Sequence, residues 1–392
     1  MNTRQKLICT MITGAVFSAL AACGGSDDSS PAPANPAAAT PTPNPYGTTP
    51  TPTPAPSVPV AGSAFKETVV VSDGSVPAPN TDANLRNGWG VAFNPNGFVW
   101  VANEGSNTST LYDGNGVVQS LVVTIPAGSN GAAGPTGIVF NGSTDFAVSA
   151  GGGTGAAPFI FASEAGTISG WSPSVLATAA VTAYDDGAGG AVYKGLALAS
   201  ANGQQFIYAT DFKNNKVDVF DKNFAKVTLP GGQFKDPALP TGYAPFGIQA
   251  VDNKIYVTFA VQAASGKVQT NGAGNGAVDV FDTSGNLFKE IAVSTNLNSP
   301  WGIALAPTDF GAFSNDLLIG NFGDGTINAY NPDTGAFIGQ LKHADGSVLT
   351  LPGIWGMAFG NGKSAQPANT LFYASGPKGK TTGAYGRIDL AN

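Results

Sequence analysis

The amino-acid sequence predicts an all-β protein, a six-bladed β-propeller whose N-terminal strand closes the last blade. Three observations lead to this prediction. Residues 63–392 contain six similar units whose leading glycines recur at intervals of 47 to 58 residues. Each unit combines short apolar strands with turn residues, a pattern typical of propeller blades. Charged residues make up only 11% of the chain and 53 residues are glycine, as expected for short strands joined by tight turns.

Residues 1–22 are predicted to be a lipoprotein signal peptide. Arg4 and Lys6 precede a mostly apolar stretch of 16 residues, which is shorter than the roughly 20 residues of a membrane-spanning helix. The stretch ends in Leu-Ala-Ala-Cys and resembles the bacterial lipobox, in which the cysteine, here Cys23, is lipidated and becomes the mature N-terminus. An ordinary signal peptide is the alternative. Glycine follows Cys23 where an aspartate would favour the inner membrane, so we expect an outer-membrane lipoprotein of the bacterial cell envelope.

Residues 23–62 are predicted to be the lipidated cysteine and a tether rich in proline, alanine and threonine. The 39 residues after Cys23 include 11 prolines. Proline fixes φ and lacks a backbone donor, so extended polyproline II is expected, with a reach of at most about 120 Å. Recognition of the proline segments by a partner is the alternative to a spacer. Because Cys9 belongs to the signal segment, the mature chain has no disulfide.

Each unit of the predicted propeller begins with an apolar strand led by one glycine. The six glycines are Gly90, Gly137, Gly195, Gly247, Gly302 and Gly356. Asn-Gly pairs at 96–97, 141–142 and 202–203 predict hairpin turns after the first three strands, because both residues tolerate positive φ. The second strands are predicted at 98–102, 146–150, 206–210, 254–259, 317–320 and 371–374. The third strands are predicted at 109–113, 167–171, 216–221, 277–282 and 326–331.

The last unit lacks an outer strand of its own. Its C-terminal run, residues 383–390, supplies only a third strand, whereas residues 65–71 precede the first glycine without a partner in their own unit. We therefore expect these two segments to pair. Such pairing closes the ring and removes an open sheet edge, which would otherwise promote aggregation.

Several runs carry a resemblance to a known group of proteins. They include residues 85–90 (Leu-Arg-Asn-Gly-Trp-Gly), 99–105, 109–114, 159–164, 166–171, 191–198, 243–247 and 318–325. Together they resemble an uncharacterised bacterial family of exported six-repeat propeller proteins, some of which end in a PEP-CTERM sorting tail. Residues 386–392 show no such tail, so a lipid anchor is expected instead. A more distant similarity links the repeats to NHL-like and lactonase-like six-bladed propellers. The resemblance implies architecture and export, but no established activity.

Two rings of side chains are expected to meet at one end of the propeller channel. The first ring precedes the glycines and supplies four aromatic candidates and one lysine for ligand binding: Trp89, Lys194, Phe246, Trp301 and Trp355, with Thr136 at the sixth position. Aromatic rings at such a mouth could stack on a sugar or another flat ligand. The alternative is that they wedge between blades, because equivalent residues of repeats usually serve the repeat itself.

The second ring follows the second strands and supplies oxygen atoms. Its candidates for a metal site are Asn103, Glu104, Asp211 and Asn321. Carboxylate and amide oxygens suit calcium, which is the one cofactor that the pattern admits. The alternative is hydrogen bonding at the ends of the blades.

Composition excludes several functions. Without Arg4 and Lys6 the chain has 16 basic and 25 acidic residues, a formal net charge of −9, so we expect no nucleic-acid partner. His343 is the only histidine, which excludes a multi-histidine metal site, and no catalytic residue is assigned.

Two functions remain open. The first is a lipid-anchored module that uses the propeller mouth as a binding or scaffold surface for a glycan, peptide or protein. The second is a calcium-dependent lactonase-like hydrolase, in which a metal-bound water would attack an ester.

Overall fold

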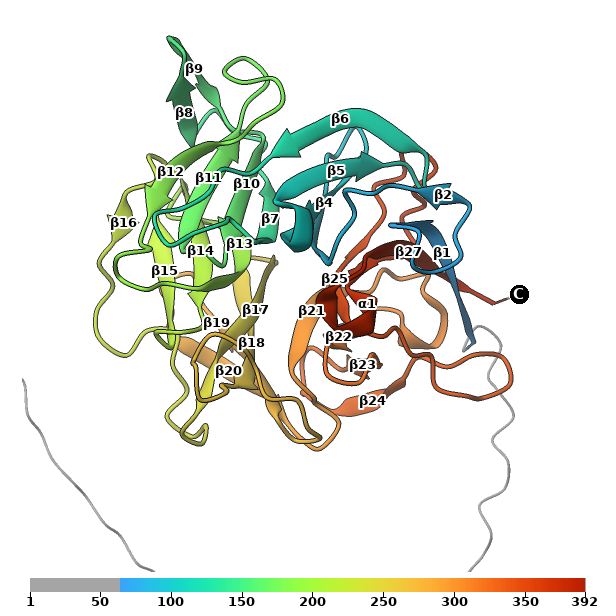
Figure 1. Ribbon diagram of the computed structural model, residues 1–392. Coiled ribbons are helices and arrows are strands. Elements are labelled where there is room, and N and C mark those ends of the chain that lie inside the picture. Colours follow the sequence, from blue (N-terminus) through green and yellow to red (C-terminus); the bar gives the residue numbers. More distant parts are fainter. Residues whose placement is uncertain (1–63, 392) are drawn as a thin grey trace, which may run out of the picture. The chain divides into compact units, whose positions relative to one another are not determined.

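The computed structural model describes residues 64–391, so the signal peptide, Cys23 and the tether lie outside the described residues. The described part is a ring of six β-sheets around a central channel, as predicted, and all their strand pairs are antiparallel except that of β1 and β2 (Figure 1). No helix in this part of the chain is long and apolar enough to cross a membrane.

Blades 1 to 3 each contain four strands, given from the channel outward. Blade 1 is β3 (Gly88–Phe93), β4 (Val99–Asn103), β5 (Thr108–Tyr112) and β6 (Val118–Thr124). Blade 2 is β7 (Pro135–Phe140), β10 (Phe159–Ser163), β11 (Thr167–Trp171) and β12 (Val181–Asp185). Blade 3 is β13 (Tyr193–Ala201), β14 (Gln204–Asp211), β15 (Lys216–Phe220) and β16 (Lys226–Val227).

Blades 4 and 5 repeat the plan, and blade 6 combines both ends of the described chain. Blade 4 is β17 (Tyr243–Val251), β18 (Lys254–Val261), β19 (Gly276–Phe281) and β20 (Leu287–Val293). Blade 5 is β21 (Pro300–Leu305), β22 (Leu317–Asn321), β23 (Ile327–Tyr330) and β24 (Phe337–Gln340). Blade 6 is β25 (Ile354–Phe359), β26 (Leu371–Ser375), β27 (Ala384–Leu390), β1 (Phe65–Ser72) and the short β2 (Asn80–Thr81).

The predicted closure of the ring is confirmed. Strand β1 pairs with β27 in antiparallel register from Phe65↔Leu390 to Ser72↔Ala384, with one bulge. Phe65 is buried, and its ring lies 4.9 Å from that of Phe310 in blade 5. The N-terminal strand therefore completes blade 6 and also packs into the next seam.

The six glycines explain how the innermost strands approach one another so closely. A Cβ on Gly90 would lie 2.5 Å from the carbonyl oxygen of Thr136, and one on Gly356 would lie 2.5 Å from that of Trp89. Equivalent Cβ atoms on the other four glycines would meet the backbone or side chains of the following blade. Any side chain here would push neighbouring blades apart, so the repeat of glycine follows from the ring geometry.

Hydrophobic clusters fill the seams between blades. Six clusters each join two neighbouring blades all the way round the ring, including the seam between blade 6 and blade 1. A seventh cluster lies on the channel axis. Burial is thus continuous around the ring, which stabilises the sheets as one unit.

The predicted second strand of blade 2 is wrong. Residues 147–150 form β8 (Ala147–Ala150), which pairs only with β9 (Gly153–Ala156) in a separate hairpin. The second strand is instead β10, whose five residues are all buried, whereas β8 buries only Val148. The turn predicted at Asn141 opens this inserted hairpin, because the Asn141 side chain bonds the carbonyl oxygens of Asp145 and Ala157.

Candidate functional site

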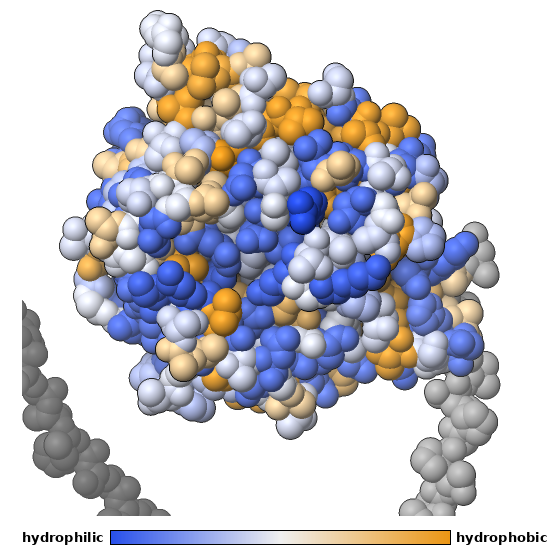
Figure 2. All heavy atoms as spheres, viewed as in Figure 1, coloured by the Kyte–Doolittle hydropathy of each residue, from blue (hydrophilic) through white to orange (hydrophobic). Residues whose placement is uncertain are grey.

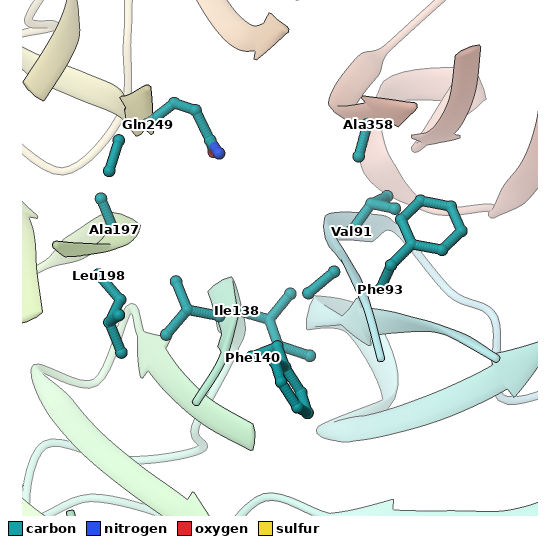
Figure 3. A pocket seen from close by; sticks show the side chains of 11 residues that line it. Val91, Phe93, Ile138, Phe140, Ala197, Leu198, Gln249 and Ala358 are labelled. Carbon is teal, nitrogen blue, oxygen red and sulfur yellow. The ribbon is translucent and has the colours of Figure 1, made fainter. Parts of the chain in front are cut away.

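The channel is open at one end and narrows toward the other. A cavity of about 230 Å³ is lined by the later residues of the innermost strands, among them Val91, Phe93, Ile138 and Leu198 (Figure 3). It leads to a neck of about 20 Å³ bordered by Gly90, Gly137, Gly356 and the side chain of Trp301. Beyond the neck lie the residues that precede the glycines, and this end is the predicted mouth.

The structure brings the four predicted aromatic residues of the mouth together as a packed plug. The Trp89 and Trp355 rings stack with centroids 3.7 Å apart, and Phe246 and Trp301 meet Trp355 edge-on at 5.9 and 6.0 Å. Phe322 stacks on the other side of Trp355 at 4.0 Å. Even the most exposed of the four, Trp301, is only 8% accessible. The rings therefore face one another more than they face solvent.

Two of the three indole N–H groups of this plug donate hydrogen bonds, and the third does not within the described part of the chain. Trp355 Nε1 donates to Asn87 Oδ1 at 3.0 Å, and Trp301 Nε1 donates to the carbonyl oxygen of Lys194 at 2.9 Å. Trp89 Nε1 is buried and finds no acceptor among residues 64–391. A buried donor without a partner costs about 1–3 kcal/mol, so this N–H is an anomaly within the plug.

Four ionisable side chains rest on the plug; we call Lys194, Glu164, Glu104 and Lys380 the mouth quartet. Lys194 is fully buried and forms an ion pair with Glu164. Glu104 accepts a hydrogen bond from Asn87 Nδ2 at 2.7 Å. Lys380 ends the short turn α1 (Pro377–Lys380), which Figure 1 shows in front of the innermost strand β25. Viewed from this side, the centre of the molecule is largely hydrophilic (Figure 2).

The two lysines of the quartet both lie over aromatic rings. Lys194 Nζ is 5.3 Å from the centre of the Trp89 ring. Lys380 Nζ lies 5.7 Å from Trp89, 5.2 Å from Trp355 and 4.9 Å from Phe322. Such distances fit cation–π attraction, which grows stronger where water is excluded.

Burial shifts the pKa values of two members of the quartet, Lys380 and Glu104. The pKa of Lys380 is lowered to about 8, chiefly by burial and then by the positive charge of Lys194, against the opposing effect of Glu164 and Glu104. The pKa of Glu104 is raised by burial, an effect that the Asn87 hydrogen bond opposes and the charge of Glu164 reinforces. Desolvation thus disfavours the charged form of both groups, as expected for a partly closed site.

The predicted metal ligands form hydrogen bonds at the ends of three blades: Asn103 and Glu104 in blade 1, Asp211 in blade 3 and Asn321 in blade 5. Asn103 donates to Thr110 at 2.9 Å, and Asp211 accepts from the backbone N–H of Val192 at 3.1 Å. Asn321 accepts from the backbone N–H of Asn298 at 3.1 Å. No hydrogen bond joins any two of Asn103, Glu104, Asp211 and Asn321, and residues 64–391 contain no group of three or more His, Cys, Asp or Glu side chains that could hold a metal.

Three residues of the mouth were not predicted from the sequence as site residues: Glu164, Asn87 and Lys380. Glu164 follows β10 as Glu104 follows β4, so it belongs to the second ring. It was missed because the second strand of blade 2 was predicted at 146–150 instead of at β10. Asn87 precedes the first unit, and Lys380 comes from a turn without a counterpart in the other repeats. The all-apolar run before Ser163 was the signal that could have revealed Glu164. His343, by contrast, lies outside the mouth, 3.3 Å from Glu67.

Comparison with other proteins identifies relatives in a virus. The uncharacterized protein R648 of Acanthamoeba polyphaga mimivirus is 31% identical over 306 residues, which are 76% of this chain and 74% of R648. The uncharacterized protein L690 of the same virus is 28% identical over 305 residues, covering 76% of this chain and 79% of L690. From the sequence we expected an exported bacterial family, whereas these relatives are viral. No family model matches the chain.

Among solved structures, similarity is low. Virginiamycin B lyase from Staphylococcus aureus is 13% identical with a TM-score of 0.48, over 84% of this chain and all of that chain. A protein of unknown function from Bacteroides thetaiotaomicron is 13% identical with a TM-score of 0.49, over 83% of this chain and 76% of that chain. Similarity at this level transfers no activity to this chain.

Proposed function

This chain belongs to the family of the mimivirus protein R648, and we propose that it is a binding or scaffold module for a glycan, peptide or protein. The observation that supports this proposal is the mouth quartet. Four ionisable side chains lie together over an aromatic plug at one end of the channel. Convergent polar groups on an apolar floor are what a recognition site needs.

We further propose that the module is displayed on a bacterial envelope by a lipid on Cys23, as an outer-membrane lipoprotein. The lipobox-like segment and the proline-rich residues that follow it support this part of the proposal. The resemblance to exported bacterial propellers agrees with it. The tether would hold the propeller away from the lipid surface and leave its mouth accessible.

Of the two functions left open by the sequence, the arrangement favours binding. A calcium-dependent hydrolase would need the oxygen atoms of Asn103, Glu104, Asp211 and Asn321 to converge on one ion. Their hydrogen bonds hold Asn103 and Glu104 at the end of blade 1, Asp211 at that of blade 3 and Asn321 at that of blade 5. We therefore propose no catalytic role for them.

A pull-down with the full chain tests the binding function. Immobilised protein is incubated with solubilised envelope glycans and proteins, and Trp301→Ala is compared with Trp100→Ala. Both variants lose one buried indole, but Trp100 packs in the seam of blades 1 and 2, outside the mouth. Loss of a specific ligand with Trp301→Ala alone is expected. Equal retention by both variants would contradict the proposed site.

Lipid anchoring is tested in cells by Cys23→Ser. The wild-type chain should incorporate radiolabelled palmitate and fractionate with outer membranes, whereas the variant should be unlabelled and soluble in the periplasm. Identical fractionation of the two chains, without label in either, would contradict the anchor.

A further inference from the structure

Among the described residues, one donor in the mouth lacks an acceptor, and a second has only a weak one. Trp89 Nε1 is buried without a partner, although the indole N–H groups of Trp301 and Trp355 are both satisfied. Lys380 Nζ forms no ion pair within residues 64–391, and its one polar contact is a long 3.5 Å approach to Gln269 Oε1. Both groups are donors, so whatever completes this site supplies an acceptor.

The two donors are also close to each other. Lys380 Nζ lies 5.7 Å from the centre of the Trp89 ring, and the buried Lys194 Nζ lies 5.3 Å from the same ring. The carboxylate of Glu164 pairs with Lys194, which leaves Lys380 as the ammonium available to a ligand. Two ammonium groups therefore lie near the one indole of the plug whose N–H has no acceptor among residues 64–391.

The turn that carries Lys380 is held in place by its own hydrogen bonds. Lys380 N donates to the carbonyl oxygen of Gly376 at 3.2 Å, and the hydroxyl of Thr382 donates to that of Pro377 at 2.7 Å. Lys378 and Lys380 both adopt positive φ, at 53° and 72°. Left-handed conformations in residues with side chains cost of order 1 kcal/mol each and persist where the surroundings impose them.

We infer that the mouth binds the carboxylate group of a singly charged ligand, with Trp89 Nε1 and Lys380 Nζ as its direct donors. This inference rests on the proposed binding function and names the chemical class that the site selects. Lys194 is paired with Glu164, so Lys380 is the one ammonium of the quartet left to balance the single charge of a carboxylate, whereas a dianion such as phosphate would bring a second negative charge into a partly buried site beside Glu104 and Glu164. An indole N–H and an ammonium together suit the two oxygens of one carboxylate.

The ionisation of Lys380 adds a pH dependence. With a pKa of about 8, Lys380 is mostly charged at pH 7 and mostly neutral at pH 9.5. The groups that face it are Lys194, which lowers its pKa, and Glu164 and Glu104, which raise it. Affinity for a carboxylate should therefore fall at least 10-fold between pH 7 and pH 9.5.

The test uses the full chain labelled with ¹⁵N-tryptophan and titrated with sodium acetate at constant ionic strength. The Trp89 indole resonance, assigned with Trp89→Phe, is expected to shift saturably with acetate. The neutral isostere acetamide should not shift it, and phosphate at pH 7.5 should act at least 10-fold more weakly. Lys380→Met should weaken acetate binding at least 10-fold, while Lys213→Met, which removes a lysine outside the quartet, should not.

Several results would overturn the inference. They are no saturable shift with acetate, an equal shift with acetamide, or unchanged acetate affinity in Lys380→Met whose fold is verified by circular dichroism. Should Lys380→Met fail to fold, Trp89→Phe keeps the ring and removes only the N–H, and unchanged acetate binding measured by calorimetry would be equally decisive. If acetate binds but the pull-down yields no ligand, the proposed binding function is rejected and the carboxylate site is retained. If the pull-down succeeds and acetate does not compete, the carboxylate inference fails alone.

Discussion

Replacing Asp279 by asparagine should stabilise the propeller at neutral pH. Blades 3 and 4 contain the same pentapeptide, Val-Asp-Val-Phe-Asp, at 217–221 and 278–282, and the first aspartate of each is buried in a seam. Asp218 accepts hydrogen bonds from Tyr193 at 2.9 Å and Lys216 at 2.7 Å, and pairs with Lys226 at 2.8 Å. Asp279 has no hydrogen-bond partner at either oxygen among the described residues.

The surroundings of Asp279 explain the difference. Its strand neighbours Ala277 and Phe281 belong to the apolar cluster between blades 3 and 4. Its nearest charged influences are the carboxyl groups of Asp236 and Glu290, and both repel a second negative charge. Burial first, and these charges second, raise the pKa of Asp279 from 3.8 to about 8.

The size of the effect on stability follows from the proton that Asp279 takes up on folding. The pKa in the folded state exceeds that of the unfolded chain, so the carboxyl lowers stability progressively as pH rises from about 4 to about 8. Each pH unit above the unfolded pKa of 3.8 lowers the free energy of unfolding by about 1.4 kcal/mol, so at pH 7 the carboxyl costs about 4 kcal/mol of stability. Asparagine has the same shape and carries no charge. We expect Asp279→Asn to raise the free energy of unfolding by about 2–4 kcal/mol at pH 7.

Urea unfolding followed by tryptophan fluorescence at pH 4.5, 7 and 9 measures this effect. The gap between variant and wild type should be small at pH 4.5 and grow toward pH 9. Asp218→Asn is the matched control and should be destabilising by about 2–3 kcal/mol at pH 7, because it leaves Lys216 and Lys226 facing a neutral group. A gap for Asp279→Asn that does not change with pH, or a loss of stability at pH 7, would refute the reasoning.

Three further predictions concern the close approach of the blades, the closing strand and Lys380. Gly247→Ala should lower the free energy of unfolding by about 1–3 kcal/mol, because its Cβ would overlap the Trp301 carbonyl oxygen, whereas Gly231→Ala meets open space and should change it by less than about 0.5 kcal/mol. Urea midpoints compare the two, and equal effects would contradict the proposed close approach of the blades. Phe65→Ala should cost about 3–5 kcal/mol by the same measurement, since it empties a buried site in the closing strand; a loss below 1 kcal/mol would contradict that packing. Above pH 8, amine-reactive reagents should modify Lys380 faster than ordinary lysines whose side chains are equally accessible, and an ordinary rate from pH 7 to 9 would contradict its lowered pKa.

Much of the fold could be predicted from residues that lie near one another along the chain. Asn202 and Gly203 both adopt positive φ between two paired strands, so the predicted turn is present. At Asn141 the same dipeptide begins an inserted hairpin instead. The dipeptide specifies a local backbone conformation, but pairing depends on which later run can bury all its side chains.

The sequence alone determined the six-unit ring and its closure, because glycine spacing and strand patterns are local and each unit repeats the same packing problem. It also indicated which aromatic residues gather at the mouth. Only the tertiary structure decided how the mouth is charged, since Glu164, Lys194 and Lys380 come from three different blades and meet through folding. The same holds for Asp218 and Asp279, which lie in identical pentapeptides: Asp218 contacts Lys216 of its own strand, Lys226 of β16 and Tyr193 of β13, whereas Asp279 has no hydrogen-bond partner among the described residues. Electrostatics depends on distances across seams, and a linear pattern does not contain those distances.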